Sequence, residues 1–224
     1  MSLFLTEDGS HSIFSEQFGV AYHSTHGAIQ ETQHIFIEAA LNHYIKQKSI
    51  NKIKILDIGF GTGLNVFMTF LESIKLDFEI DLTTIEAYPL SISTAQELNY
   101  PQLLNALHYD TVFKSLHNLS WEEKHSLSHS FSFQKHLLDF KNIAYNSVFD
   151  IVYYDAFSPE SQPELWESDM LQRVFEALKN GGILTTYCAK GSFKRALKSV
   201  GFQIENIAGP RGKREITRAT KNFV

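Results

Sequence analysis

Residues Ile53 to Gly63 read IKILDIGFGTG, and this stretch predicts a strand followed by a glycine-rich loop. The run Ile53–Ile58 is short, apolar and rich in β-branched residues, which is typical of a strand buried on both faces. Apolar residues at helical spacing follow from Asn65 to Ile74. Glycines let the backbone approach a ligand, and the start of a helix offers unpaired N–H groups. We therefore expect a cradle for a nucleotide or cofactor here.

The spacing of the loop residues narrows the class of ligand. A dinucleotide fingerprint needs glycine at Leu64, which disfavours a nicotinamide dehydrogenase, and no Gly-Lys-Ser/Thr follows to make a P-loop. What remains is an acid, Asp57, followed by Gly59, Gly61 and Gly63. A carboxylate at the strand end suits a cationic, amino-acid-like ligand. The pattern resembles the first motif of class I S-adenosylmethionine methyltransferases, and a glycine-rich turn in another α/β protein is the alternative.

The composition predicts one cytoplasmic domain, since 43% of the 224 residues are hydrophobic and 20% are charged. The single cysteine, Cys188, excludes an internal disulfide and fits a reducing compartment. No signal peptide is visible, and no apolar run approaches the ~18 residues of a membrane span, so we expect no membrane partner. Residues 190–224 hold nine Lys and Arg against two acids in a chain of net charge −5, which indicates an anionic partner there.

Alternating strands and helices predict an α/β fold with a doubly wound, mostly parallel sheet. Residues 1–48 are expected to form an extension of short strands and a helix over Glu31–Lys46, ahead of a core over residues 49–224. Further core strands are expected at residues 81–85, 131–138, 149–154, 183–187, 202–207 and 215–220.

The helices of the core are predicted from apolar spacing and from residues that end a helix. A helix over Leu90–Leu98 should stop at Pro101, and one over Ser168–Lys179 should stop at Asn180-Gly181-Gly182. Another is expected over Phe193–Val200, and an insertion near 102–130 should contain short helices.

Three acids follow predicted strands at the carboxyl edge of the sheet, where such sheets bind ligands. Glu86 is placed to accept both hydroxyls of an adenosine ribose, with a solvated loop acid as the alternative. Asp139 is placed to accept from the adenine amino group, with a helix cap as the alternative. Asp155 opens the turn Asp-Ala-Phe-Ser-Pro, which would hold its carboxylate beside the amine that accepts a methyl group; a structural acid is the alternative. The ten histidines lack partners at a recognised ligand spacing, so we expect no metal.

Four stretches of the chain resemble the methyltransferase half of the MnmC family, bifunctional enzymes that modify the wobble uridine of certain tRNAs: Tyr22–Phe36, Leu56–Asn65, Asp155–Trp166 and Gly201–Glu215. The resemblance implies the class I fold, with a seven-stranded sheet covered by helices on both faces, and S-adenosylmethionine as the cofactor. It also implies that Asp155 is the active-site aspartate. The implied reaction converts 5-aminomethyl(-2-thio)uridine into 5-methylaminomethyl(-2-thio)uridine. No flavin fingerprint is present, so we expect no FAD, as in a stand-alone version of this half.

The basic C-terminal segment is the candidate surface for tRNA. Gly209–Arg214 is a predicted loop that carries Arg211, Lys213 and Arg214, and Lys194 lies on the helix before it. A solvated basic face is the alternative. Two other functions remain open: methylation of a small amine or a protein, and non-catalytic RNA binding by a degenerate cofactor pocket.

Overall fold

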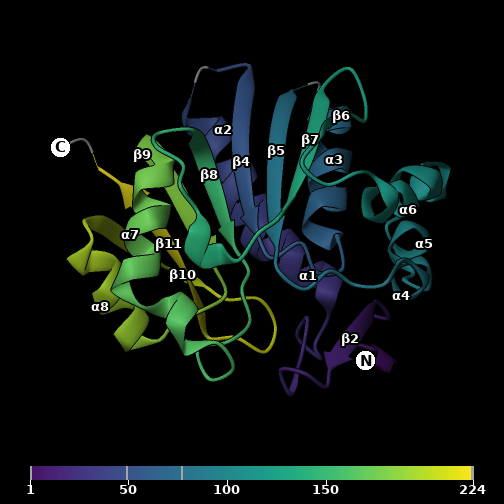
Figure 1. Cartoon of the computed structure of the whole chain (residues 1–224), viewed down its shortest axis with the longest axis horizontal. Coiled ribbons are helices and arrows are strands. Elements are labelled where there is room, and N and C mark those ends of the chain that lie inside the picture. Colours follow the sequence, from purple (N-terminus) through teal and green to yellow (C-terminus); the bar gives the residue numbers. More distant parts are fainter. Residues whose placement is uncertain (1, 49, 77, 223–224) are drawn as a thin grey trace.

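The computed structural model describes residues 2–48, 50–76 and 78–222, and in them the strand before the glycine loop lies in the middle of an eight-stranded sheet (Figure 1). In spatial order the strands of this sheet are β10 (Phe202–Ala208), β11 (Glu215–Lys221), β9 (Leu178–Thr186), β8 (Phe149–Tyr154), β4 (Lys52–Ile58), β5 (Glu79–Glu86), β7 (Phe131–Leu137) and β6 (Lys124–Ser126).

The centre of the sheet is parallel, as the alternation of elements predicts. β9, β8, β4, β5 and β7 run in one direction, whereas β11 is antiparallel to β9 and β10 is antiparallel to β11. The chain builds outward from β4 to β5 and β7, then returns to β8 and β9 on the other side. The strand order therefore reverses between β4 and β8, and ligands of open α/β sheets bind at such a switch point.

The sheet has one strand more than the seven that the sequence implied. The additional strand, β6, pairs antiparallel with β7 at the edge of the sheet. It comes from the end of the 102–130 segment, where only short helices were expected. Three residues, Lys124 to Ser126, are too few to show the alternation by which a strand is recognised.

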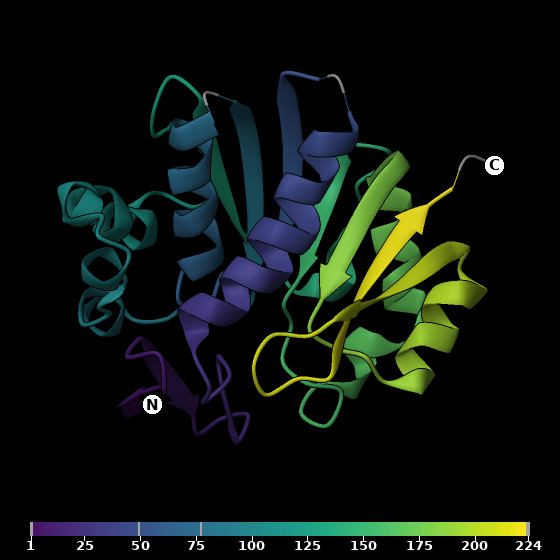
Figure 2. The same cartoon turned by 180° about the vertical axis from the view of Figure 1, so that it is seen from behind.

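Helices cover both faces of the sheet (Figures 1 and 2). One face is crossed by a continuous helical run of α1 (Ala28–Thr32), η1 (Gln33–Asn42) and α2 (His43–Gln47), with α3 (Leu64–Leu76) beside it. The other face is covered by α7 (Ser168–Ala177) and α8 (Gly191–Ser199).

Two neighbouring tyrosines of β8 pack into the hydrophobic cores on opposite faces of the sheet. Tyr153 packs against Phe36 of η1 with ring centroids 5.1 Å apart, and Tyr154 packs against Trp166 at 5.2 Å on the opposite face. Trp166 ends η4 (Pro163–Trp166), a short 3₁₀ turn after β8. Every residue of β8 is buried, as expected of a continuous apolar strand covered on both sides.

The N-terminal residues divide between a small sheet and the main fold. β1 (Ser2–Leu5), β2 (His11–Ser15) and β3 (Val20–Ala21) form a separate antiparallel sheet. The helix expected over Glu31–Lys46 is longer, and its middle part, η1, is a π-helix that contacts β8, β9 and β11. Arg218 of β11 donates to the carbonyl of Ala39 in η1 at 2.9 Å. The helical half of residues 1–48 thus packs on the core, and a division at residue 48 stays a prediction.

Two expected helix stops are wrong. The first helix after β5 is α4 (Ile92–Gln96), and Pro101 does not end it but lies in the first turn of α5 (Tyr100–Leu103), where a missing N–H costs no hydrogen bond. Helix α7 ends at Ala177, and Asn180-Gly181-Gly182 lies inside strand β9. The pairing of β8 with β9 shifts register here, and a Cβ on Gly182 would lie 2.8 Å from the carbonyl of Lys179. These glycines therefore serve a β-bulge.

The expected insertion contains α5, η2 (Leu107–Tyr109) and α6 (Asp110–Asn118), and a buried cation of β7 attaches it to the sheet. The ammonium of Lys135 donates to the carbonyls of Leu116 and His117 at 2.9 and 2.8 Å and lies 4.5 Å from the ring centroid of Trp121. The last carbonyls of a helix lack partners within it, so a cation at this end is stabilising. Burial lowers the pKa of Lys135 to about 8.

We expect Lys135→Met to lower the free energy of unfolding by about 1–3 kcal/mol at pH 7, because two buried carbonyls lose a charged donor. The folded pKa lies below the ordinary value of 10.5, so the unfolded chain binds more protons between pH 8 and 10.5. The contribution of Lys135 to stability therefore rises over this interval. Urea unfolding at pH 7 and pH 10 should show the gap between wild type and variant widening.

The matched control is Lys124→Met, which removes a half-exposed cation from the neighbouring strand β6. Its effect should be below about 1 kcal/mol, as for other surface ion pairs. A gap between wild type and Lys135→Met that stays constant from pH 7 to pH 10 would show that Lys135 keeps its ordinary pKa.

Candidate active site

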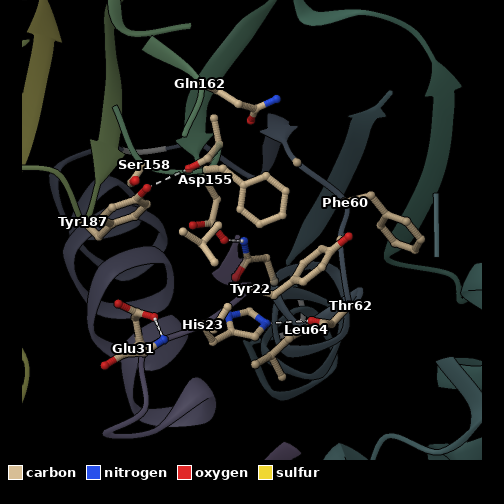
Figure 3. A pocket seen from close by; sticks show the side chains of 18 of the residues that line it. Tyr22, His23, Glu31, Phe60, Thr62, Leu64, Asp155, Ser158, Gln162 and Tyr187 are labelled. Carbon is tan, nitrogen blue, oxygen red and sulfur yellow. Dashed lines mark hydrogen bonds between the residues drawn. The ribbon is translucent and has the colours of Figure 1, made fainter. Parts of the chain in front are cut away.

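A cavity of about 270 Å³ opens at the switch point, beyond the carboxyl ends of β4, β5 and β8 (Figure 3). The glycine loop forms its floor, and Asp155 follows β8 directly. The segment from Val20 to Ser24, which comprises β3 of the small sheet and the residues after it, also lines the cavity. Lys213 reaches the cavity from the loop between β10 and β11. Residues far apart in the chain therefore build one site.

The glycine loop has the shape that its sequence predicts. Gly59, Gly61 and Gly63 all have positive φ, at 102°, 47° and 75°. A Cβ on Gly59 would lie 2.7 Å from the carbonyl oxygen of Asp155, and one on Gly61 would lie 3.0 Å from the ring of Tyr22. Side chains at these two positions would close the space between the loop and its neighbours, so the glycines keep this part of the cavity open.

Glu86 lies where the sequence analysis places it, at the end of β5 and on the wall of the cavity. Its carboxylate accepts the backbone N–H of Gly61 at 2.9 Å and that of Tyr88 at 2.8 Å. Burial raises the pKa of Glu86, and these two N–H donors oppose the rise. The N–H of Ala87 also acts on this carboxylate. A carboxylate has about four acceptor positions, so these backbone partners leave acceptor capacity for a hydroxyl of a ligand.

The amide of Asn65 connects two of the predicted acids. Its nitrogen donates to the carboxylate of Asp155 at 2.9 Å and to that of Asp57 at 3.3 Å, while its oxygen accepts the hydroxyl of Thr32 at 3.0 Å. Thr84 donates to the other oxygen of Asp57 at 2.7 Å. A polar network thus runs from strand β5 through the first turn of α3 to the carboxyl end of β8.

Asp57 lies behind the loop rather than on the wall of the cavity. It is fully buried, and burial raises its pKa to about 7, against the hydrogen bonds from Thr84 and Asn65. A direct contact between Asp57 and a ligand stays a prediction. The structure itself gives Asp57 contacts with Asn65, which does line the cavity.

Asp155 faces the cavity. Its surroundings favour the protonated form of its carboxyl group. Burial raises its pKa well above the usual range, and the nearby carboxylate of Glu31 raises it further. The hydrogen bond from Asn65 and the charge of Lys213 act in the opposite direction. A carboxylate with a raised pKa and a donor that fixes its orientation suits the transfer of a proton.

Asp139, like Asp57, is not among the residues that line the cavity. Its carboxylate accepts the backbone N–H of Lys141 at 3.0 Å and caps η3 (Phe140–Asn142). The next residue, Phe140, lines the cavity instead. The contact of Asp139 with adenine stays a prediction.

The sequence analysis missed the contribution of the N-terminal segment. The ring nitrogen of His23 lies 2.8 Å from the hydroxyl of Thr62 in the glycine loop, and burial lowers its pKa. Tyr22 packs edge-on against Phe157, at 4.9 Å between centroids. Glu31, in α1, accepts the N–H of Ser24 at 2.9 Å. These residues fall in the stretch 22–36 that carries the family resemblance, which is the signal that could have identified them.

The cations predicted to contact tRNA do not share one environment. Lys213 turns into the cavity, 3.2 Å from Glu31, and Lys194 lies 2.7 Å from Glu215. Their side chains are only 27% and 15% exposed. Arg211 is 72% exposed, with a surface ion pair to Glu7, and Arg214 is also exposed. The two arginines are the ones free to meet a large anionic partner.

Residues 2–48, 50–76 and 78–222 contain no group of three or more His, Cys, Asp and Glu side chains arranged to hold a metal ion. Within the same ranges, no helix combines the length and the apolar character that crossing a membrane requires.

Comparison with known proteins agrees with this geometry. The chain is 28% identical to the tRNA 5-methylaminomethyl-2-thiouridine biosynthesis bifunctional protein MnmC of Marinomonas sp., over 94% of this chain and 32% of that protein. It is 26% identical to the protein of the same name from Actinobacillus pleuropneumoniae, over 95% of this chain and 34% of that one. The chain thus spans about a third of the length of these relatives.

Solved structures confirm the predicted fold class. MnmC2 from Aquifex aeolicus superimposes with a TM-score of 0.79 and 27% identity, over 100% of this chain and 70% of that one. A spermidine synthase from Thermotoga maritima shares the fold, with a TM-score of 0.59 and 14% identity, over 100% of this chain and 73% of that one. A family model described as S-adenosyl-L-methionine-dependent methyltransferase matches residues 105–222, which include Asp155, the basic loop and the last six strands of the sheet. The chain, whose open glycine cradle lies beside a carboxylate at each neighbouring strand end, belongs to the S-adenosyl-L-methionine-dependent methyltransferases.

Proposed function

We propose that this chain methylates the primary amine of 5-aminomethyluridine, or of its 2-thio form, at the wobble position of tRNA. The observation that carries the proposal is Asp155, a carboxylate of raised pKa that faces the cavity beside the cofactor cradle. Relatives named for the biosynthesis of 5-methylaminomethyl-2-thiouridine support this class of substrate. The product would be 5-methylaminomethyl(-2-thio)uridine.

The residues of the cavity fit S-adenosylmethionine. Glu86 would accept its ribose hydroxyls, since the backbone N–H groups of Gly61, Tyr88 and Ala87 do not fill all the acceptor positions of the carboxylate. Gly59 and Gly61 leave the space that a Cβ would fill, and Phe140 and Tyr88 offer apolar surface beside Glu86. When bound, S-adenosylmethionine supplies a methyl group on a sulfonium, whose carbon–sulfur bond breaks with its electron pair left on sulfur as the amine nitrogen forms the new bond.

Asp155 would accept a proton from the amine. A primary alkyl amine resembles lysine, with an ordinary pKa of about 10.4, and is therefore protonated at neutral pH. The nitrogen has no free lone pair until one proton leaves, and the Asp155 carboxylate is placed to accept it. Asn65 holds that carboxylate in position, and the aromatic rings of Tyr22 and Phe157 exclude water from the same space.

The direct test is transfer of a tritiated methyl group to tRNA from cells that lack this modification, with nucleoside analysis of the product. Radioactivity in 5-methylaminomethyl(-2-thio)uridine is the expected result. Labelling of a small amine or a protein, with unlabelled tRNA, would point to the second kind of acceptor. Absence of cofactor binding by calorimetry would favour the non-catalytic RNA-binding alternative.

Glu86→Ala should weaken S-adenosylmethionine binding at least tenfold. The change removes hydrogen bonds from a charged acceptor, each worth ~1.5–3 kcal/mol. Isothermal titration calorimetry measures the effect, and Glu79→Ala at the exposed start of the same strand is the matched control. Equal affinities for the wild type and Glu86→Ala would remove Glu86 from the binding site.

Asp155→Asn should bind the cofactor normally but slow methyl transfer by ~10²–10⁴-fold, the usual contribution of a general base. Asparagine can still accept the hydrogen bond from Asn65, but it cannot take up the proton of the amine. Single-turnover transfer to tRNA gives the rate, with Asp169→Asn on the exposed first turn of α7 as the control. A variant that turns over at the rate of the wild type would make Asp155 a structural acid.

Of the four cations predicted to contact tRNA, Arg211 and Arg214 are the two that we propose bind its phosphates. The pair of Arg211 with Glu7 is exposed and therefore weak, so a phosphate can replace the glutamate. Changing both arginines to alanine should weaken tRNA binding and leave cofactor affinity unchanged. The slope of log K against log salt should flatten by ~0.7–0.9 for each phosphate contact that is lost. Filter binding at several salt concentrations that yields the wild-type slope would move the tRNA surface elsewhere.

A further inference from the structure

The ammonium of Lys213 occupies an anionic and aromatic corner of the cavity. It lies 3.2 Å from the carboxylate of Glu31 and 5.0 Å from the ring centroid of Tyr187. Asp155 lines the same cavity, and its charge and that of Glu31 both act on Tyr187. In Figure 3 the side chains of Asp155, Glu31 and Tyr187 lie on one side of the cavity. We call these three residues and the space between them the cation corner.

The cation corner needs a positive charge. Glu31 has only 10% of its side chain exposed, and its second oxygen is used by the N–H of Ser24. Two carboxylates that face one partly buried space repel each other and lose hydration, so an unpaired state is costly. The face of an aromatic ring adds attraction for a cation, and Tyr187 is held in place by a hydrogen bond from its hydroxyl to the carbonyl of Ala156 at 2.8 Å.

We propose that the cation corner is the subsite for the ammonium form of the acceptor amine, and that Lys213 fills it in the free protein as an internal stand-in. This inference rests on the proposed function, because it names the acceptor as a cation. A primary alkyl ammonium has the charge and the three N–H donors of a lysine head group. Glu31 then becomes a specificity-determining residue, and Asp155 receives the proton of an ammonium that is already bound.

The side chain of Lys213 can move out of the cation corner. Its four-carbon side chain is flexible, and it extends from a loop between two strands, where a turn joins the N–H of Lys213 to the carbonyl of Pro210 at 2.9 Å. Withdrawal of the side chain and entry of a substrate ammonium exchange one cation for another, so the charge of the corner is unchanged. A neutral acceptor could not replace the positive charge of Lys213. An acceptor with an added carboxylate would be repelled by the carboxylate of Glu31.

Two pairs of probes test the subsite at pH 7 with S-adenosylhomocysteine present. The nucleosides 5-aminomethyluridine and 5-hydroxymethyluridine differ in charge but little in shape, as do n-propylammonium and n-propanol. Calorimetry or NMR titration should show that the wild type prefers the ammonium of each pair. Glu31→Gln should weaken binding of the ammonium probes about tenfold and leave binding of the neutral probes unchanged, since one charged hydrogen-bond acceptor is lost.

The direction in which Lys213→Met changes ammonium affinity decides the question, because this variant keeps the length of the side chain but removes the competing internal ammonium. It should tighten binding of the ammonium probes and leave the neutral probes unchanged. Lys190→Met is the matched control, since Lys190 is an exposed cation of the same basic segment, paired with Glu160 away from the cavity. Unchanged affinity for S-adenosylhomocysteine in every variant shows that the fold is intact.

The outcomes separate this inference from the proposed function. Preference for n-propylammonium without binding of either nucleoside would support the subsite and contradict a uridine substrate. Binding of both nucleosides with no preference for the ammonium would overturn the subsite and leave the proposed substrate standing. If Lys213→Met weakens ammonium binding or leaves it unchanged, or if no ammonium probe binds better than its neutral partner, the subsite is overturned.

Discussion

The side-chain amide of Asn65 is the interaction on which the candidate site depends. One nitrogen donates to Asp57 at the end of β4 and to Asp155 at the end of β8, the two strands on either side of the switch point. Carboxylates this close and this buried repel each other, and a shared donor offsets part of that repulsion. The amide oxygen is held by Thr32, so the nitrogen cannot turn away. The distance between the cofactor cradle and the acceptor acid is thereby fixed by one residue of α3.

The N-terminal segment is part of the site rather than an appendage to it. Tyr22 covers Gly61, His23 meets Thr62, and Glu31 reaches the acceptor side of the cavity. The loop between β10 and β11 joins the same assembly through Lys213 and through Arg211, which pairs with Glu7. The N-terminal segment and the loop between β10 and β11 therefore meet at the cavity.

Local patterns in the sequence were sufficient for most strands of the sheet and for two of the acids at their ends. Strand β8 has the predicted bounds, and Glu86 and Asp155 reach the cavity, because apolar runs and the carboxyl edge of a parallel sheet are properties of short stretches. Contacts across the fold were not predictable in this way. Nothing around Asn65 or Lys213 in the sequence reveals that each lies beside an acid from a distant element. The glycines after α7 looked like a helix stop because a bulge in β9 uses the same residue type.

The distribution of charge explains why a chain of net charge −5 can serve a cationic chemistry with an anionic partner. Asp57, Glu86, Asp155 and Glu31 gather around one cavity, whereas exposed arginines lie on a loop at its rim. A sulfonium cofactor and an ammonium acceptor both carry positive charge, and each would repel the other in an apolar space. Under the proposed function, carboxylates on both sides would lower that repulsion, and Asp155 would remove part of it by taking the proton from the amine. The basic rim would act at longer range, attracting phosphates that do not enter the acidic interior.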